Sequence, residues 1–361
     1  MSALFNVQPN ATPVAPAERD LLLQDPGFGR VFTDHMAVVN YREGEGWHDP
    51  RIVARGPLST DPATSVLHYA QEIFEGMKAY RQPDGGVALF RPQANAQRLR
   101  ASAERLAMPP LPEALFLQSI RALVRADRDW VPHSPEGALY LRPFQFASEV
   151  FLGVKPASEY IYAVIASSVG SYWKGGVRAI SLWVSQVYTR AAPGGTGAAK
   201  CGGNYAASLV ALAEAQGQGC DQVLFLDAVE RRWIEELGGM NIFFVFDDGT
   251  LRTPPLGGTI LPGITRDTLI ALARAQDLRV EEAPYAVDEW QADVARGRVV
   301  EAFACGTAAV VTPIGRVRGA GFDFTIGTGG PGQLTEHLRR QLTDIQFGRA
   351  PDPHGWLERV D

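Results

Sequence analysis

One lysine of this 361-residue chain stands in a run of small residues and glycines directly before a helix-like stretch. The run is GGTGAAKCGGNY, residues 194–205, and its lysine is Lys200. A solvated lysine needs no such neighbours, whereas bulky side chains would keep a flat molecule away from the amine. A primary amine forms an imine with an aldehyde, and desolvation favours the neutral form that attacks. The segment therefore predicts a tight turn that presents Lys200 to an aldehyde.

A phosphate-binding P-loop is the alternative for this segment, because residues 194–200 have its frame. Ala199, however, stands where that motif requires glycine. Cys201 stands where Ser or Thr would bind magnesium. We therefore prefer the imine-forming lysine.

The segment WIEELGGMN, residues 233–241, offers a carboxylate. A carboxylate beside a pyridine nitrogen keeps that ring protonated, so that it can accept electrons. Glu235 and Glu236 are alternatives, because alternation along a strand sends them to opposite faces. We expect the glutamate that does not face the pyridine ring to be solvated.

The segment LPGITR, residues 261–266, opens a predicted helix. The first amides of a helix, here at Ile264 and Thr265, favour a phosphate group. Thr307, which follows Gly306, can add a hydroxyl. An amine, a carboxylate and a phosphate cup are the parts that hold pyridoxal phosphate (PLP), so the sequence predicts this cofactor.

Composition excludes several other classes of function. Hydrophobic residues make up 46% of the chain and charged residues 20%, as in ordinary globular proteins. A net charge of -6 gives no basic surface for nucleic acid or anionic membrane. No apolar run reaches the roughly 20 residues that span a bilayer, and we expect no secretory signal. The three cysteines lack metal-ligand spacing and predict free thiols in the cytoplasm, with no bound metal.

The length favours two domains. We predict a flexible N-terminal arm over 1–26, an N-terminal α/β domain over 27–169, an interdomain loop over 170–176 and a C-terminal cofactor-binding domain over 177–361. Predicted strands cover 31–41, 138–146, 160–168, 223–226, 232–237, 241–246 and 299–305. Predicted helices cover 95–108, 115–124, 206–216 and 265–276, and Asp84-Gly85-Gly86 predicts a hairpin turn. The absence of a regular βαβ rhythm favours an α+β (mixed α/β) fold over a Rossmann sheet.

Six short motifs also occur in a characteristic order. They are FTDHM (32–36), FEGMKA (74–79), LYLRP (139–143), GAAKCGGNY (197–205), ELGGMN (236–241) and LPG (261–263). With them the chain resembles the branched-chain aminotransferases of PLP fold type IV, the D-amino-acid aminotransferase-like fold, over roughly residues 28–313. The resemblance implies reversible transfer of the amino group of L-leucine, L-isoleucine or L-valine to 2-oxoglutarate. It also implies a homodimer, with small-molecule substrates and no nucleic-acid or membrane partner.

The resemblance implies a cofactor site around the catalytic Lys200. Glu236 matches the carboxylate at the pyridine nitrogen, and Tyr205 matches the bond to the ring oxygen. Arg98 matches the phosphate arginine, although Arg91, Arg100 and Arg105 are equally available by sequence alone. The implied cofactor-binding residues are Arg98, Lys200, Tyr205, Glu236, Ile264, Thr265 and Thr307.

The substrate pocket must hold both an aliphatic chain and the side-chain carboxylate of glutamate. Aromatic rings with hydroxyl tips satisfy both demands. The resemblance gives Arg142 to glutamate recognition, the Thr307 and Ala308 amides to the α-carboxylate, and 152–154 to a loop that a partner subunit inserts. The implied substrate residues are Phe28, Tyr69, Phe74, Tyr140, Arg142, Val154, Tyr172, Gly239, Thr307 and Ala308.

Two departures and two alternatives accompany the resemblance. Gly239 stands where some members have threonine, which removes a hydroxyl contact. Ala309 and Thr312 occupy the positions of the redox Cys-x-x-Cys of vertebrate members, which excludes that control. The alternative functions are another fold type IV enzyme (a D-amino-acid aminotransferase or aminodeoxychorismate lyase) and a non-catalytic PLP-binding protein.

Overall fold

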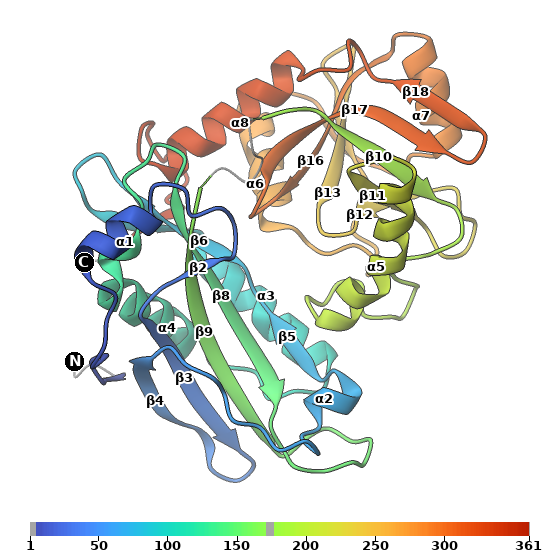
Figure 1. The fold of residues 1–361 in the computed structure, drawn as a ribbon. Helices are drawn as coiled ribbons and strands as arrows, with labels where there is room; N and C mark the ends of the chain where they lie inside the picture. The colour runs from blue at the N-terminus through green and yellow to red at the C-terminus, as the bar shows by residue number, and fades with distance from the viewer. Residues whose placement is uncertain (1–4, 171–176, 361) are drawn as a thin grey trace. The chain divides into compact units, whose positions relative to one another are not determined.

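The computed structural model describes residues 5–170 and 177–360 (Figure 1). The chain forms two compact units. The first contains Met1–Tyr172, Ala199–Gly202 and Asp344–Asp361, and the second contains Trp173–Ala198 and Gly203–Thr343. Most of the predicted interdomain loop, 171–176, lies outside the described residues. The predicted domain boundaries stay predictions, although two segments expected in the second domain, 199–202 and 344–361, belong to the first unit.

The first unit is built on a ten-stranded sheet, in the order β1-β4-β3-β9-β8-β6-β7-β19, with β2 on β9 and β5 on β8. β1 pairs with β4 in parallel, and the other pairs are antiparallel. The strands are β1 Asn6–Val7, β2 Val31–Phe32, β3 His35–Arg42, β4 Gly46–Ala54, β5 Glu72–Phe74, β6 Met77–Arg81, β7 Val87–Phe90, β8 Ala138–Ala147, β9 Glu159–Val169 and β19 Leu357–Val360.

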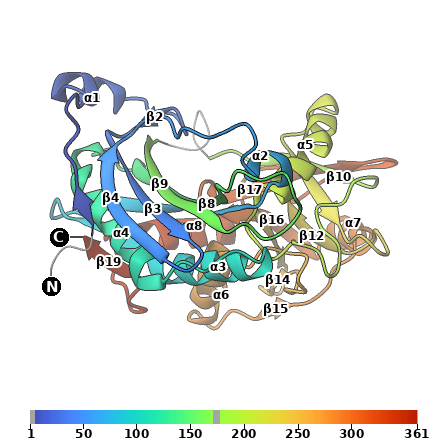
Figure 2. The same cartoon turned by 90° about the horizontal axis from the view of Figure 1, so that it is seen from below.

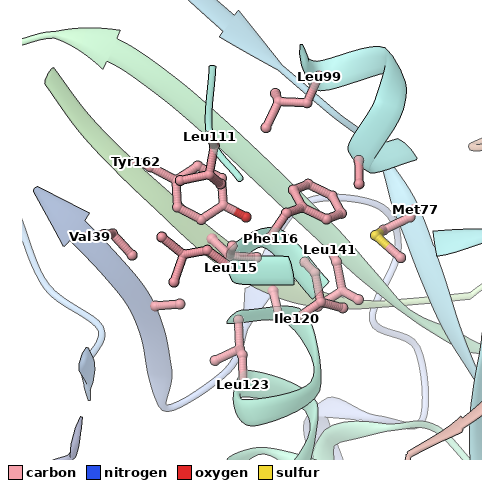
Figure 3. Packing of buried hydrophobic residues seen from close by; sticks show 14 of the residues in the cluster. Val39, Met77, Leu99, Leu111, Leu115, Phe116, Ile120, Leu123, Leu141 and Tyr162 are labelled. Carbon is pink, nitrogen blue, oxygen red and sulfur yellow. The ribbon is translucent and has the colours of Figure 1, made fainter. Parts of the chain in front are cut away.

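Helices accompany this sheet, and two of them pack along it. The helices are α1 Pro16–Leu22, α2 Val66–Tyr69, α3 Pro92–Arg105 and α4 Glu113–Ala126, followed by the 3-10 turn Arg128–Trp130. Figures 1 and 2 show α3 and α4 side by side along the sheet. Apolar residues of α4 recur every three or four positions, which places Phe116, Ile120 and Leu123 on one buried stripe. Figure 3 shows this stripe packed with Leu141 of β8 and Tyr162 of β9, so α4 anchors the core of the unit.

The flexible arm over 1–26 stays a prediction, although the described part of this segment makes several contacts within the first unit. Phe5 is buried, and the amide of Gln8 donates to the Ile52 carbonyl at 2.8 Å. Further along, the Asp34 carboxylate accepts hydrogen bonds from the Val14 amide (2.9 Å) and the Trp130 indole (2.8 Å). These partners are distant in sequence, so local periodicity gives no sign of these contacts.

The second unit is built on a nine-stranded sheet, in the order β12-β11-β10-β17-β16-β13-β14-β15, with β18 on β17. Its strands are β10 Ile180–Ser185, β11 Gln222–Leu226, β12 Ile234–Leu237, β13 Asn241–Phe246, β14 Leu251–Thr253, β15 Val280–Glu282, β16 Val299–Gly306, β17 Val310–Gly319 and β18 Phe322–Thr325. The remaining helices are α5 Gly202–Gly217, α6 Ile264–Arg274, α7 Val287–Ala295 and α8 Gln333–Gln346. Helices α6 and α7 pack against the central strand β16.

The α+β fold is confirmed, and so are the elements with strong local patterns. The turn at Asp84-Gly85-Gly86 joins β6 to β7, and Gly85 has the positive φ of 81° that such a turn requires. The helix predicted over 95–108 begins and ends three residues earlier, as α3. Within the described ranges, no helix is long and apolar enough to cross a membrane.

Candidate active site

In the first unit, the backbone of Lys200 is fixed on both sides. Its carbonyl accepts the Phe74 amide of β5 at 2.9 Å, and its amide donates to the Ser102 hydroxyl of α3 at 2.9 Å. Two residues later, the Gly202 amide donates to the Glu72 carboxylate. A Cβ atom at Gly202 would collide with that carboxylate, so the glycine permits the close approach. The small residues predicted to surround the amine thus serve to seat its backbone.

The environment of Lys200 favours a neutral amine. Its Nζ lies 4.8 Å from the centroid of the Phe74 ring. Burial, with the charge of Arg98 as the next cause, lowers the pKa of Lys200 to about 8, although Glu75 opposes this shift. A lysine with this pKa supplies the attacking free base at physiological pH far more readily than a solvated lysine does.

Arg98 is buried, whereas Arg100 and Arg105 are exposed. Its Nε lies 2.7 Å from Glu75 Oε1, and its Nη2 lies 2.9 Å from Glu75 Oε2. Burial alone would raise the pKa of Glu75, but the charge and hydrogen bonds of Arg98 outweigh burial and lower it. Glu75 is not among the residues predicted from sequence, although it stands inside the FEGMKA motif. An ionised Glu75 fixes Arg98 and tempers its effect on Lys200.

Four predicted substrate residues gather beside Lys200 in the first unit. The Arg142 guanidinium lies 4.9 Å from the Phe74 ring centroid and 5.4 Å from that of Tyr140. Its Nη2 donates to the Tyr140 hydroxyl at 3.0 Å, and Phe28 meets Tyr140 edge-on at 5.2 Å. Arg142 Nε is buried with no hydrogen-bond partner among the described residues. This cluster combines apolar ring faces with one positive charge.

Tyr69 and Val154 belong to a more exposed part of the same unit. The Tyr69 hydroxyl donates to the Leu152 carbonyl, which ties α2 to the loop at 150–154. This loop is apolar yet open to solvent, since Val154 is 85% exposed and Leu152 is 59% exposed. Tyr172, the remaining aromatic of the predicted pocket, lies outside the described residues.

In the second unit, Glu236 is held by three partners. Its Oε1 accepts the Leu261 amide at 2.8 Å and lies 2.9 Å from Arg190 Nη1. Its Oε2 accepts Asn241 Nδ2 at 3.3 Å. The side chain of Glu236 is 3% exposed, so these contacts orient a desolvated carboxylate. Arg190 is not among the residues predicted from sequence, and Asn241 appears there only as part of a motif.

Glu235 faces the other side of β12, as the alternation predicts. Our expectation that it is solvated is wrong, because Glu235 is only 7% exposed. Burial raises the pKa of its carboxyl. β12 is the edge strand of the sheet, and Pro254, Pro255 and Thr259 lie beside the Glu235 face of this strand. Local sequence cannot show such neighbours.

The predicted phosphate residues of the second unit lie on elements that meet at Asn241. Helix α6 begins at Ile264 without a side-chain cap, and the amides of its first residues have no acceptor within the helix. Gly263, at the N-cap, approaches Asn241 so closely that a Cβ would collide with its amide oxygen. Asn241 also pairs with Cys305 across β13 and β16. The sheet therefore carries Thr307 and Ala308, which follow β16, toward the start of β13.

Tyr205 and Gly239 meet in the same part of the second unit. A Cβ at Gly239 would lie 3.6 Å from the Tyr205 ring, and one at Gly306 would lie 3.5 Å from the Gly239 carbonyl oxygen. Both distances are ordinary van der Waals contacts, so the two glycines lie next to predicted cofactor residues without crowding them. The donor set of the chain fits PLP: an amine of lowered pKa, a buried oriented carboxylate and a helix start without a side-chain cap.

The lowered pKa of Lys200 predicts its reactivity in protein freed of cofactor. Acylating reagents attack only the neutral amine, so acetylation of Lys200 should rise with pH and reach half its maximum near pH 8. A lysine model peptide, which titrates at about 10.4, should need about two further pH units. Competitive labelling with trace acetic anhydride, followed by peptide mass spectrometry, measures both midpoints. A midpoint for Lys200 equal to that of the peptide would contradict the desolvated environment.

Comparison with known proteins agrees with this geometry. The family model described as amino-transferase class IV matches residues 72–317. The branched-chain-amino-acid aminotransferase of Mycobacterium tuberculosis is 55% identical over 363 aligned residues, which cover 99% of this chain and 99% of that protein.

Solved structures agree as well. The branched-chain aminotransferase of Escherichia coli matches with a TM-score of 0.74 and 30% identity, over 90% of this chain and 100% of that one. The T.th enzyme in complex with N-(5'-phosphopyridoxyl)-L-glutamate matches with a TM-score of 0.72 and 30% identity, over 90% of this chain and 99% of that one. The same T.th enzyme has been solved with 4-methylvaleric acid, and that structure matches with a TM-score of 0.71.

Proposed function

This chain belongs to the class IV aminotransferases, and on that basis we propose that it is a PLP-dependent branched-chain aminotransferase. The reaction is the reversible exchange of an amino group between L-leucine, L-isoleucine or L-valine and 2-oxoglutarate. The T.th relative binds both a glutamate adduct of the cofactor and 4-methylvaleric acid, which has the carbon skeleton of leucine. The single observation that carries the chemistry is Lys200, an amine whose pKa is lowered to about 8.

Different residues of the chain carry out different parts of the proposed reaction. PLP, when bound, supplies an aldehyde carbon and a ring that accepts electrons. We assign to Lys200 the bond to that carbon and, once the substrate has replaced it, the transfer of the proton at the substrate Cα. Glu236 holds the proton on the ring nitrogen, because Arg190 and the Leu261 amide keep its carboxylate in place.

The other cofactor contacts follow the same logic. The amides of Ile264 and Thr265 at the start of α6, the Thr307 hydroxyl and Arg98 suit the phosphate. We assign Tyr205 to the ring oxygen, because its phenol can donate a hydrogen bond to that oxygen. Burial supports the assignment of Arg98 and Thr265, whereas Tyr205, Ile264 and Thr307 are half-buried and are assigned by their positions in the second unit.

Substrate binding requires one pocket for two kinds of side chain. The rings of Phe28, Phe74 and Tyr140 suit an aliphatic chain, and the Arg142 guanidinium beside two of them suits the carboxylate of glutamate. The Thr307 and Ala308 amides suit the α-carboxylate that all substrates share. Tyr69, Tyr172 and Gly239 complete the proposed pocket, and Gly239 contributes space instead of a hydroxyl.

Replacing Arg142 with methionine should impair glutamate more than leucine. In this variant the side-chain carboxylate of bound glutamate would be buried without its charged partner. The barrier of the glutamate half-reaction should therefore rise by about 2–4 kcal/mol. The leucine half-reaction should slow by less than about 1 kcal/mol, because an aliphatic chain loses no hydrogen bond. Single-turnover absorbance of the cofactor measures each half-reaction separately.

The control for this substitution is Arg125→Met, a change at an exposed position of α4. It should leave both half-reactions within about twofold. Equal slowing of both half-reactions by Arg142→Met would instead make Arg142 a structural residue, or a partner of the α-carboxylate.

A homodimer explains the exposed apolar loop of the first unit. Val150, Phe151, Leu152 and Val154 are 58%, 43%, 59% and 85% exposed. A cluster of this kind on the surface favours burial against another protein, and we propose a second copy that inserts Val154 toward its substrate. We also place the enzyme in the cytoplasm, because all three cysteines are free thiols.

An amino-donor screen tests the proposal as a whole. L-leucine, L-isoleucine and L-valine should be active with 2-oxoglutarate, and D-alanine should not. Activity with D-alanine alone would favour a D-amino-acid aminotransferase. A protein that binds PLP but turns over no donor would be the non-catalytic alternative.

A further inference from the structure

The first unit contains an ion pair that its stability does not explain. Glu75, between β5 and β6, is 0% exposed, and its partner Arg98 on α3 is 9% exposed. The cost of desolvating two charges commonly offsets their attraction, so an apolar pair of similar volume would support the core at least as well. A role in the function of the site is the alternative explanation for a pair of this kind.

The Glu75 carboxylate is bonded on both oxygens. Oε1 accepts Arg98 Nε at 2.7 Å, and Oε2 accepts Arg98 Nη2 at 2.9 Å. Oε2 also accepts Asn95 Nδ2 at 2.7 Å and the Gly76 amide at 3.1 Å. Because Glu75 is closed to solvent and surrounded by these donors, its effect on any bound molecule passes through its neighbours.

The geometry of the pair fixes the Arg98 guanidinium. Nε and Nη2 form one edge of the planar group, and two parallel bonds to one carboxylate hold both the position and the plane of that group. A guanidinium has more N–H donors than one carboxylate uses, so Arg98 can bind Glu75 and another oxyanion at once. An arginine that is already held loses less side-chain entropy when an anion binds.

We propose that Glu75 is a positioning residue of the cofactor site and that it acts through Arg98, whose guanidinium it presets for the phosphate group. This inference rests on the proposed function, in which Arg98 binds the phosphate of PLP. The charge of Glu75 alone would oppose a phosphate, so its benefit must come from the orientation of Arg98.

A comparison of PLP with pyridoxal isolates this effect. Pyridoxal has the same aldehyde and ring but lacks the phosphate. Titration of the full-length protein, freed of cofactor and followed by tryptophan fluorescence, gives both affinities. Glu75→Gln should bind PLP at least about tenfold more weakly than the parent, because it loses one preset charge-assisted contact, and pyridoxal within about threefold.

The amine of Lys200 provides a second measurement. Besides burial, Arg98 and Arg142 lower the pKa of Lys200, whereas Glu75 and Tyr140 raise it. Loss of the Glu75 charge should therefore lower the midpoint of Lys200 acetylation by at least about half a pH unit. Water that entered a loosened site would instead raise the midpoint toward about 10.4, the value of a solvated lysine. A rise would thus indicate a merely structural role and overturn the proposal.

The matched control is Glu104→Gln, the same substitution on α3. The Glu104 side chain is 60% exposed and lies 3.8 Å from Arg100. The control should keep both affinities within about twofold and the acetylation midpoint within about 0.2 pH units of the parent.

A double variant keeps the test decisive if Glu75→Gln does not fold. Arg98→Met combined with Glu75→Gln removes both charges, which leaves no unpaired charge in the core. If Glu75 acts through Arg98, the ratio of PLP to pyridoxal affinity in the double variant should match that of Arg98→Met within about threefold. A further fall of this ratio by tenfold or more would show an independent role of Glu75 and overturn the proposal.

The outcomes also separate this inference from the proposed function. If the parent binds PLP and Glu75→Gln binds it as tightly or more tightly, Glu75 does not position Arg98, while the proposed function stands. Equal weakening of PLP and pyridoxal by Glu75→Gln would likewise overturn only this inference. A parent protein that binds no PLP would overturn both.

Discussion

Replacing Lys200 with alanine should lower turnover of L-leucine and 2-oxoglutarate by about 10⁴-fold or more. The substitution removes both the amine that bonds to the cofactor and the base that moves the Cα proton, and these contributions together account for a loss of this size. Borohydride reduction should fix the cofactor on the parent protein, which is expected to be yellow, and leave none on the variant. Intact-mass measurement after reduction checks the bond, and steady-state assays check the rate.

Lys155→Ala is the control for loss of an amine. The Lys155 side chain is 44% exposed and paired with Glu149 in the first unit, so the substitution should change turnover by less than about twofold. Lys78 is the informative rival, because it too is shielded from solvent. Peptide mapping that finds the reduced cofactor on Lys78 would contradict the central assignment.

Local patterns in the sequence are enough to single out the groups to which we assign the chemistry. The glycine run marks Lys200, and the LPG segment marks the start of α6, which begins at Ile264, one residue before the predicted start at 265. The alternation of Glu235 and Glu236 along β12 is also visible in sequence. Each of these features depends on neighbours within a few positions, where spacing and residue type decide the structure.

The partners of those groups are not visible in sequence, because they come from distant segments. Arg190, which pairs with Glu236, stands 46 positions earlier in the chain (236 minus 190). Glu75, which pairs with Arg98, follows β5, whereas Arg98 lies on α3. The pairing of β19 with β7 is not visible in sequence for the same reason, because most of the chain between these strands belongs to the other unit. Among the four arginines between 91 and 105, Arg98 differs from the others in being buried. Burial is a property of the folded chain, so the sequence does not show this difference.

The surroundings of a side chain are also hidden from an analysis of strand alternation. Spacing alone gives Glu235 and Glu236 equal standing as strand acids on opposite faces. In the structure both are buried, but Glu236 has three partners and Glu235 Oε2 has none among the described residues. The difference arises from the segment between Pro254 and Leu261. Its Leu261 amide donates to Glu236 on one face of β12, whereas its mainly apolar residues lie beside Glu235 on the other face.

Replacing Glu236 with glutamine should slow proton removal at the substrate Cα by at least about 10²-fold. A neutral amide cannot hold the charge on the ring nitrogen, so the ring accepts the electron pair less well. The Arg190 side chain, 2% exposed, would also lose its charged partner, which should lower the stability of the second unit by up to about 3 kcal/mol. Stopped-flow absorbance of the half-reaction with L-leucine measures the first effect, and thermal unfolding measures the second.

Two comparisons separate the charge of Glu236 from its packing. Glu236→Asp keeps the charge and should recover part of the rate, whereas a purely structural role would make the shorter side chain at least as harmful as glutamine. Glu235→Gln makes the same chemical change one residue away, on the face of β12 that holds none of the predicted cofactor residues, and should alter the rate by less than about threefold. Equal slowing by Glu235→Gln and Glu236→Gln would mean that the carboxylate at the ring nitrogen is misassigned, because only one face of the strand can present its acid to the ring.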